Sequence, residues 1–481
     1  MSNKKFNGAV YTPSHIVNSI LDLVQYKKGI TCKHIIDNSC GDGAFLIEVV
    51  RRYCFDFFSS NSDTDLLKDH LEDFIHGIDN NIKAILQCKE SLNNLIKEFG
   101  VQNVQWDVSV GNTLEVSKYD NSMDFVVGNP PYIRVHNLND TYDKVKQYYF
   151  ADNGMTDLFI VFFEIGLKML NPTGKMGLIT PSSFLRSKAG SNLRGYIYKN
   201  KNLEKVVDLE HFQAFDATTY TMITIFNNNN NFDTIEYFTY DENTLKPEKI
   251  TDLLYDDVFI NQSMFFSKNA FLDYLKRIEE NFKNRERRNI IVKNGFATLS
   301  DKIFIGDFDF KKGVIDLIKA STGKWHKCVY PYDVNGNLLS LEQLGEYTEV
   351  SQYLLENKEK LLSRSISSNQ PWYSFGRSQA INDVVVDKVA INTIIKDVDS
   401  IKINFVESGK GVYSGLYIIS DYSFQEIVNV VKTDRFIEYL KLLKNYKSGG
   451  YYSFSSKELE KFLVYSLEKG DNGQLRLFKD N

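Results

Sequence analysis

The sequence has no apolar run long enough to cross a membrane. A membrane-spanning helix needs about 18 or more consecutive apolar residues, and none of the 481 residues lies in such a run. The amino-terminal segment MSNKKFNGAVYTP also lacks the apolar core of a signal peptide. These absences predict a cytoplasmic protein with no membrane contact.

Cysteine is scarce. The chain has five cysteines, Cys32, Cys40, Cys54, Cys88 and Cys328. They form no close pairs with the spacing of metal ligands, and their odd number argues against a disulfide framework. We expect no metal site, and thiols that are reduced and mostly buried.

An excess of positive charge is missing as well, since the net charge is -5. Whole-chain charge averages over faces that point in different directions, so local patches must decide whether nucleic acid binds. The stretch KNRERR contains Arg285, Arg287 and Arg288, which are candidates for phosphate contacts. A charge run of this kind is also typical of a solvated helix face.

The chain is long enough for two domains at roughly 100 to 250 residues each. Residues 1–245 alternate short β-branched runs with helix-length segments, a pattern that predicts βαβ units and a mostly parallel sheet. Residues 246–481 contain shorter mixed segments and predict a mixed α+β domain. The polar run NNNNNFD, residues 227–233, predicts a surface loop near the boundary.

Four polar elements follow predicted strands of the first half. In HIIDNSCGDGAF a strand ends at Asp37, and a turn with Gly41 and Gly43 opens a helix at about Ala44. A second strand ends at Asp79, where a carboxylate can accept both hydroxyls of a ribose. A full Gly-x-Gly-x-x-Gly fingerprint is absent, which favours a nucleoside ligand without phosphates.

The third and fourth elements carry asparagine. Asn112 follows a short apolar strand, and the run MDFVVG ends in Asn129-Pro130-Pro131-Tyr132. The two prolines stiffen the turn, Asn129 offers a side-chain acceptor, and Tyr132 offers a flat face. This combination favours a planar substrate with an exocyclic amine, although a proline-stiffened turn with a buried tyrosine is the simpler structural alternative.

The ordered set of motifs resembles the gamma class of DNA adenine-N6 methyltransferases of bacterial restriction-modification systems. The segment Tyr11-Thr12-Pro13 stands ahead of the glycine turn, as in that family, and the resemblance spans about residues 8 to 226. It implies a Rossmann-like class I methyltransferase domain over residues 1–245, followed by a DNA target-recognition domain over residues 246–481. It also implies S-adenosyl-L-methionine as cofactor and double-stranded DNA as partner.

Each matching position takes the role that the family gives it. The residues expected to act on a flipped-out adenine are Asn129, Pro130, Pro131, Tyr132 and Phe215, with Phe212 and Tyr220 as alternatives to Phe215. The residues expected to bind the cofactor are Tyr11, Thr12, Pro13, Asp37, Ser39, Cys40, Gly41, Gly43, Asp79, Asn80, Asn112, Thr113 and Asn129. The family often has an acid where this chain has Asn112, so here an amide oxygen must serve as the acceptor.

The second half offers candidates for reading DNA. The segment WYSFGRSQ supplies Trp372, Arg377 and Gln379, which combine an aromatic ring with side chains that pair with guanine and adenine edges. A structural turn explains the segment equally well. The resemblance further implies a monomer, with any DNA cleavage carried out by a separately encoded restriction endonuclease that shares the target site.

Other functions share parts of this pattern. Methyltransferases that act on a glutamine amide in a protein, or on an RNA base amine, carry the same tetrapeptide, but they lack a second half of this length. Cytosine-N4 enzymes usually begin the tetrapeptide with serine, so Asn129 favours adenine. A DNA-binding regulator with a vestigial cofactor fold would not need Asn129 to Tyr132, Gly41 and Asp79 together.

Overall fold

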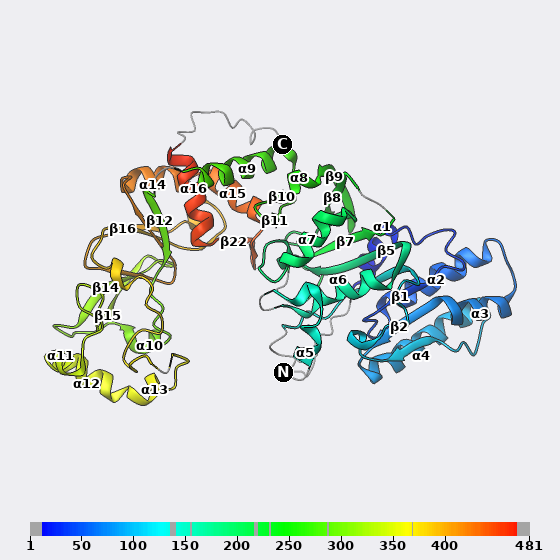
Figure 1. Ribbon diagram of the computed structural model, residues 1–481, viewed down its shortest axis with the longest axis horizontal. Helices are drawn as coiled ribbons and strands as arrows, with labels where there is room; N and C mark the ends of the chain where they lie inside the picture. The colour runs from blue at the N-terminus through cyan, green and yellow to red at the C-terminus, as the bar shows by residue number, and fades with distance from the viewer. Residues whose placement is uncertain are drawn as a thin grey trace. The chain divides into compact units, whose positions relative to one another are not determined.

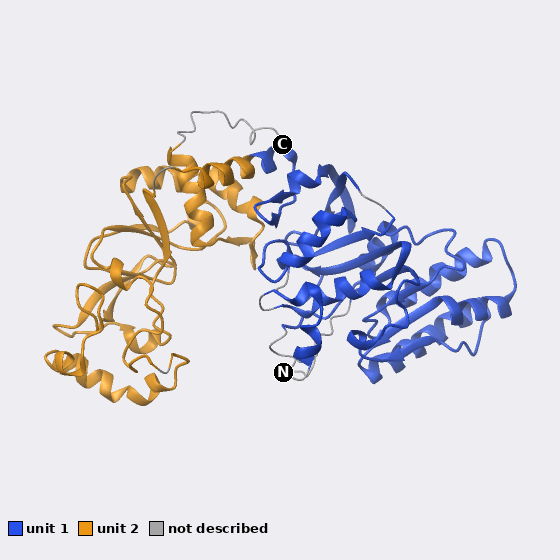
Figure 2. Ribbon diagram, in the orientation of Figure 1, with its two compact units in different colours: residues 1–273 blue, residues 274–481 orange. Residues whose placement is uncertain are grey.

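The computed structural model describes residues 12–134, 141–153, 156–215, 220–229, 232–285, 288–367 and 369–468. The chain divides into two compact units, residues 1–273 and 274–481 (Figure 2). The division lies within helix α9 (Asn269–Lys283), further along the chain than the expected boundary after residue 245. Strand β9 (Lys246–Leu254) pairs with β8 (Thr234–Asp241), which places the residues directly after 245 in the first unit.

The first unit is built on a nine-stranded sheet with the order β3-β2-β1-β4-β5-β7-β6-β8-β9 (Figure 1). Its remaining strands are β1 (Ile35–Asp37), β2 (Ile75–Asp79), β3 (Asp107–Val110), β4 (Met123–Gly128), β5 (Leu170–Pro181), β6 (Leu203–Asp208) and β7 (Thr221–Asn227).

Most neighbouring strands of this sheet are parallel. The pairs β3-β2, β2-β1, β1-β4, β4-β5 and β6-β8 are parallel, while β7 lies antiparallel to both β5 and β6. Parallel strands are covered on both faces and therefore read as nearly continuous apolar runs, and β1 is buried throughout. The predicted α/β class with a mostly parallel sheet is confirmed.

Helices supply the cover. The main ones are α1 (Ser14–Leu23), α2 (Ala44–Phe58), α3 (Thr64–Phe74), α4 (Ile82–Ile96), α6 (Leu158–Met169) and α7 (Ser191–Asn200), with short helices α5 (Tyr142–Val145) and α8 (Tyr255–Val258). Buried side chains of α1, α2, α3 and α4 join those of the central strands in one core cluster. A two-stranded pair, β10 (Phe259–Ile260) and β11 (Ser263–Met264), completes the unit.

The second unit contains three small sheets with short helices. The strands are β12 (Ile290–Asn294), β13 (Ile305–Gly306), β14 (Val314–Lys319), β15 (Lys324–Val329), β16 (Lys388–Ile391), β17 (Ile394–Ile395), β18 (Ile403–Val406), β19 (Gly411–Tyr413), β20 (Leu416–Ser420), β21 (Tyr446–Lys447) and β22 (Tyr451–Ser453). The helices after α9 are α10 (Asp301–Phe304), α11 (Leu341–Gly345), α12 (Thr348–Glu356), α13 (Lys358–Leu362), α14 (Phe424–Val431), α15 (Asp434–Leu443) and α16 (Ser456–Glu468). This mixed composition agrees with the expected α+β class.

The structure shows the environment of each cysteine and the length and polarity of the described helices. All five cysteines are free thiols, and four are buried, with only Cys32 exposed. In the part of the chain that the structure describes, every helix is too short or too polar to span a bilayer.

Candidate active site at the carboxyl edge of the parallel sheet

The four polar elements lie along one edge of the sheet. Strand β1 ends at Asp37, β2 ends at Asp79 and β4 ends at Gly128, directly before Asn129. In the register of the sheet, Asp37 pairs with Val127 and Asp79 with Val110. Because the carboxyl ends of parallel strands share one edge, these side chains come together where open α/β sheets bind their ligands.

The glycine turn follows β1 and opens α2 at Ala44, as expected. Gly41 and Gly43 have φ angles of 53° and 96°, in the left-handed region that favours glycine. A Cβ at Gly43 would lie 2.7 Å from Cys88 Sγ, so the turn can lie against α4 only without a side chain there. At Gly41 a Cβ would meet nothing within 4 Å, which leaves space beside the turn.

Asp79 ties the second strand to this turn. Its Oδ2 accepts a hydrogen bond from Gly41 N at 3.0 Å, and its Oδ1 accepts one from Asn81 N at 2.8 Å. A carboxylate has about four lone-pair positions, so these two bonds leave acceptor capacity for ligand hydroxyls. The neighbouring Asn80 is exposed.

Asp37 is buried, with 1% of its surface exposed. Burial raises the pKa of its carboxyl to about 8, and the nearby Asp79 charge adds to the rise, while hydrogen bonds from Ser39 oppose it. Ser39 N donates to Asp37 Oδ1 at 3.0 Å. A Cβ at Gly128 would lie 2.8 Å from the same Oδ1, so glycine at the end of β4 leaves room beside this carboxyl.

The Asn112 side chain is held by its own turn. Its Oδ1 accepts from Leu114 N at 3.2 Å, and its Nδ2 donates to Glu115 Oε1 at 2.8 Å. Its buried neighbour Thr113 donates from Oγ1 to Asn38 O at 2.6 Å, which ties this turn to the residue after Asp37. The Asn112 oxygen has a second lone pair for a ligand amine.

Together the two carboxylates and this amide make an acceptor-rich set. Such a set suits an amine, ribose hydroxyls and an adenine amine, and it does not suit a phosphate. The residues present therefore fit S-adenosyl-L-methionine, which carries an ammonium, a ribose and an adenine but no phosphate.

Hydrogen bonds hold Asn129 through both its side chain and its backbone. Its Nδ2 donates to Thr12 Oγ1 at 3.1 Å, and its backbone carbonyl accepts from Ser39 Oγ at 3.3 Å. Thr12 lies directly before Pro13, the N-cap of α1, and Ser39 lies in the turn after β1. Two of the predicted cofactor residues, Thr12 and Ser39, are thus hydrogen-bonded to the predicted catalytic asparagine.

Tyr132 is half-buried in an aromatic group. Its hydroxyl donates to Ile179 O on β5 at 3.1 Å, and burial raises the pKa of that hydroxyl well above its ordinary value. The Tyr132 ring meets Phe159 and Phe215 edge to face, with centroid distances of 6.3 and 6.2 Å. The alternatives to Phe215 make other contacts: Phe212 meets His15 and Tyr240, and Tyr220 meets His211.

In the second unit, two predicted DNA-binding residues take part in its internal packing. Arg285 Nη1 pairs with Glu460 Oε1 at 2.9 Å, and its guanidinium lies 3.8 Å from the Phe282 ring centroid. Trp372 packs against the core of the unit, and its carbonyl accepts from Arg364 Nη2 at 2.6 Å. Arg288 and Arg377 are exposed.

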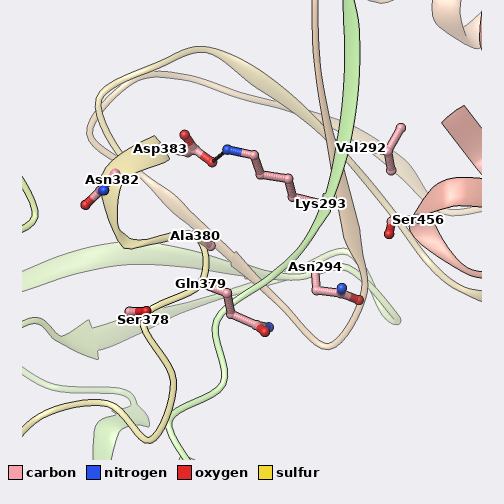
Figure 3. Close-up of a pocket in the computed structure, with 9 residues that line it drawn as sticks. All are labelled: Val292, Lys293, Asn294, Ser378, Gln379, Ala380, Asn382, Asp383 and Ser456. Carbon is pink, nitrogen blue, oxygen red and sulfur yellow. Dashed lines mark hydrogen bonds and ion pairs between the residues drawn. The ribbon is translucent and has the colours of Figure 1, made fainter. Parts of the chain in front are cut away.

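Gln379 lies on the wall of an open pocket of about 380 Å³ (Figure 3). Its Nε2 donates to Gly295 O at 2.6 Å, so the other end of its amide remains as an acceptor. Across the pocket, Lys293 Nζ pairs with Asp383 Oδ2 at 2.7 Å, and Asn294 and Ser456 also line the pocket. The pocket therefore combines donors and acceptors with nearly balanced charge.

Two predicted site residues, Tyr11 and Arg287, lie outside the described residues. Two contacts were missed by sequence reasoning. The Thr12 hydroxyl bonds Asn129 across 117 positions of sequence, and the Ile179 carbonyl fixes the Tyr132 hydroxyl across 47. A backbone carbonyl is present in every residue type, so no sequence signal indicates Ile179, whereas the Tyr-Thr-Pro segment did mark the neighbourhood of Thr12.

Comparison with known proteins finds restriction-modification methylases. Residues 42–215 match the Eco57I restriction-modification methylase family. The chain is 25% identical to the type II methyltransferase M.BstVI of Geobacillus stearothermophilus, over 82% of this chain and 79% of that protein. It is 23% identical to the type II restriction enzyme and methyltransferase RM.Eco57I of Escherichia coli, over 89% of this chain but only 54% of that protein.

A solved structure extends the likeness of the fold through both units. The type IIL restriction-modification enzyme MmeI, determined in complex with DNA, aligns with a TM-score of 0.63 at 12% identity. The alignment covers 92% of this chain and 63% of that one. Methylases of this kind use S-adenosyl-L-methionine, which the acceptor set at the sheet edge fits. Residues 42–215 are therefore similar to the Eco57I restriction-modification methylase family, and the curated relatives of the chain are type II methyltransferases.

Proposed function

We propose that this protein is a site-specific DNA methyltransferase that modifies the N6 amine of a flipped-out adenine. The observation that carries the proposal is the position of Asn129-Pro130-Pro131-Tyr132 directly after β4, beside Asp37 and Asp79 on the carboxyl edge of the sheet. The names of the relatives support DNA as the substrate. The second unit, residues 274–481, is the proposed DNA target-recognition part.

Adenine N6 needs help for two reasons. Its lone pair is delocalised into the ring, and inside a duplex the amine is stacked and paired. The base must therefore leave the stack before it can react. The half-buried Tyr132 ring, braced by Phe159 and Phe215, is a suitable surface for the extruded base.

Activation of the amine falls to two acceptors. The Asn129 side-chain oxygen and the Pro130 carbonyl accept the two N6 hydrogens, which draws the nitrogen toward a tetrahedral shape and frees its lone pair. When bound, S-adenosyl-L-methionine supplies an electrophilic methyl group on its sulfonium. Asp37, Asp79 and Asn112 hold the ligand groups that orient this methyl group, so transfer relies on positioning and electrostatics.

A strong general base is not required. The amine becomes acidic as it gains the methyl group and releases its proton afterwards, so a histidine or glutamate beside Asn129 is unnecessary. We also propose that the protein acts on double-stranded DNA as a monomer. Any cognate nuclease is then a separate polypeptide.

The test is to express the full chain in a methylation-deficient host and to read the genomic DNA by long-read sequencing. We expect N6-methyladenine at one sequence motif with the wild-type protein and none with Asn129→Ala. The purified variant should still bind the cofactor. Unmodified DNA from a folded, cofactor-binding wild-type protein would contradict the proposal and redirect the search to a protein glutamine amide or an RNA base amine.

A further inference from the structure

The Thr12 side chain contacts the Asn129 carboxamide nitrogen. Its Oγ1 accepts a hydrogen bond from Asn129 Nδ2 at 3.1 Å, and only 3% of the Thr12 surface is exposed. A hydrogen bond in so buried a position is shielded from competition by water. The contact joins the segment before α1 to the turn after β4.

The support beneath Thr12 is rigid. Pro13 caps α1 with φ at -59°, and the next turn of the helix places Ile16 and Val17 in the core with at most 1% exposure. Arg52 of α2 fastens the exposed side of α1 through Asn18 Oδ1 at 2.6 Å and Asp22 Oδ1 at 2.8 Å. Thr12 therefore lies directly before a helix that is packed against the core and against α2.

The contact decides which end of the carboxamide remains for a substrate. Nitrogen and oxygen of an amide sit on the same carbon, so fixing one end fixes the other. If the amide were turned over, its N–H groups would face the N–H groups of the base, and donor would oppose donor. With the nitrogen bonded to Thr12, the oxygen is the end of the amide that can accept a hydrogen bond from an amine.

A second contact fixes the backbone of the same residue. Ser39 Oγ donates to the Asn129 carbonyl at 3.3 Å, and Ser39 N is itself bonded to Asp37. The backbone and the side chain of Asn129 are thus held from two different elements. The bond to Thr12 acts on the carboxamide plane.

We propose that Thr12 is a positioning residue for methyl transfer, which keeps the Asn129 carboxamide oriented with its oxygen toward the reacting amine. This inference rests on the proposed function, because it takes Asn129 as the acceptor. It also assigns Thr12 a task distinct from the cofactor contact expected from the Tyr-Thr-Pro motif.

The experiment compares Thr12→Val, which keeps the shape but removes the hydroxyl, with Thr12→Ser, which keeps the hydroxyl. The methylation rate is measured in single turnovers at saturating S-adenosyl-L-methionine, and cofactor affinity is measured separately by calorimetry. Misplacement by about 1 Å can cost roughly 10²-fold in rate. We therefore expect a loss of about tenfold to hundredfold in Thr12→Val, cofactor affinity within about twofold of wild type, and substantial recovery in Thr12→Ser.

Ser19→Ala is the matched control, because Ser19 is a buried hydroxyl of α1 that donates to His15 O on its own helix at 2.8 Å and lies outside the proposed catalytic and cofactor sites. Its methylation rate should equal that of wild type. The inference is overturned if Thr12→Val matches wild type at saturating cofactor, or if Thr12→Ser is as slow as Thr12→Val. Failure of the proposed function would show differently, as a wild-type protein that methylates no adenine.

Discussion

At the scale of single residues, Tyr132 separates two contributions that one substitution would confuse. Tyr132→Phe removes only the hydroxyl bonded to Ile179 O, which should cost about 0.5–1.5 kcal/mol of stability and leave the ring for stacking. Tyr132→Ala removes the ring, and base stacking is worth roughly 1–3 kcal/mol. We expect kcat/KM near wild type for Phe and clearly lower for Ala. Wild-type kcat/KM in Tyr132→Ala would rule out the stacking role.

Asp37 predicts a pH dependence of cofactor binding. Burial raises the pKa of this carboxyl to about 8, so below that pH the Asp37 carboxyl of the cofactor-free protein is protonated. In the proposed function Asp37 holds the cofactor ammonium, which requires the carboxylate, so binding releases the proton. We expect affinity to fall by up to about tenfold for each pH unit below 8. Calorimetry from about pH 6.5 to 8.5 should show this slope in wild type and lose it in Asp37→Asn. A flat profile in wild type would count against the Asp37 contact.

The same carboxyl affects stability with the opposite sign from an ordinary paired aspartate. Its pKa is raised from 3.8 to about 8, so the folded chain binds the proton more tightly than the unfolded chain. Its contribution is fully present below about pH 3.8 and is lost as pH rises through about 8. Asp37→Asn should therefore remove part of any loss in Tm between pH 6 and 8.

At the scale of elements, a chain of hydrogen bonds joins the amino ends of β1, β2 and β3, opposite the site. His34 Nδ1 lies 2.9 Å from His76 Nε2, and His76 Nδ1 lies 2.8 Å from Asp107 Oδ2. Both hydrogen bonds can form with the two rings neutral. His34 Nδ1 then donates to His76 Nε2, and His76 Nδ1 donates to Asp107 Oδ2. Protonation adds a charge to a partly buried pair of rings.

This chain predicts sensitivity to mild acid. Burial, followed by the nearby His76, lowers the pKa of His34 from its ordinary 6.5. A lowered pKa means that stability is present above about pH 6.5 and is lost as pH falls through the folded value. We expect Tm to drop between about pH 7 and 5.5, and to drop less in His34→Gln. The pKa of Asp107 is lowered far below this window, so a drop of equal size in His34→Gln would contradict the assignment.

The elements that could be predicted from the sequence are those encoded locally. Apolar runs that end in Asp37, Asp79 or Gly128 predict both the strands and the residues at which they end. Consecutive βαβ units bring those ends to one edge of the sheet. Contacts that depend on packing could not be predicted. The bond between Thr12 and Asn129, and the bond between His34 and His76 across neighbouring strands, follow from helix docking and register.

The predicted basic residues of the second half illustrate the same limit. The charge run suggested three similar arginines, but Arg285 is paired with Glu460, 175 positions away in sequence, and its side chain is only 13% exposed. Composition gives the charge of a residue and leaves its partner unspecified. Of the two arginines of this run that the structure describes, Arg285 and Arg288, Arg288 is the exposed one.

At the scale of the whole molecule, the net charge of -5 is spread over a chain that must still approach a polyanion. Exposed cations then carry the salt dependence of DNA affinity. We expect Arg288→Ala to weaken binding uniformly across sequences and to reduce the salt slope by about one. Arg285→Ala should instead lower Tm through the lost pair with Glu460. Equal salt slopes in Arg288→Ala and wild type would show that Arg288 contacts no phosphate.

The proposed catalytic residues lie in the first unit and Gln379 lies in the second, so we expect target choice and methyl transfer to be separable. Gln379 lines the pocket of the second unit with one amide end bonded to Gly295 O and an acceptor end remaining, beside Lys293 and Asn294. A good contact to a base edge contributes about 1–3 kcal/mol of discrimination. Gln379→Ala should therefore relax the methylated motif at one position, as read by long-read sequencing, while cofactor affinity stays at the wild-type value. Gln352→Ala is the matched control, because Gln352 is a surface glutamine of α12 that bonds to Glu356 on its own helix, and it should leave the motif unchanged. If Gln379→Ala methylates the wild-type motif with wild-type selectivity, this pocket does not read the target. The exposed Arg377 is then the next candidate for a base contact.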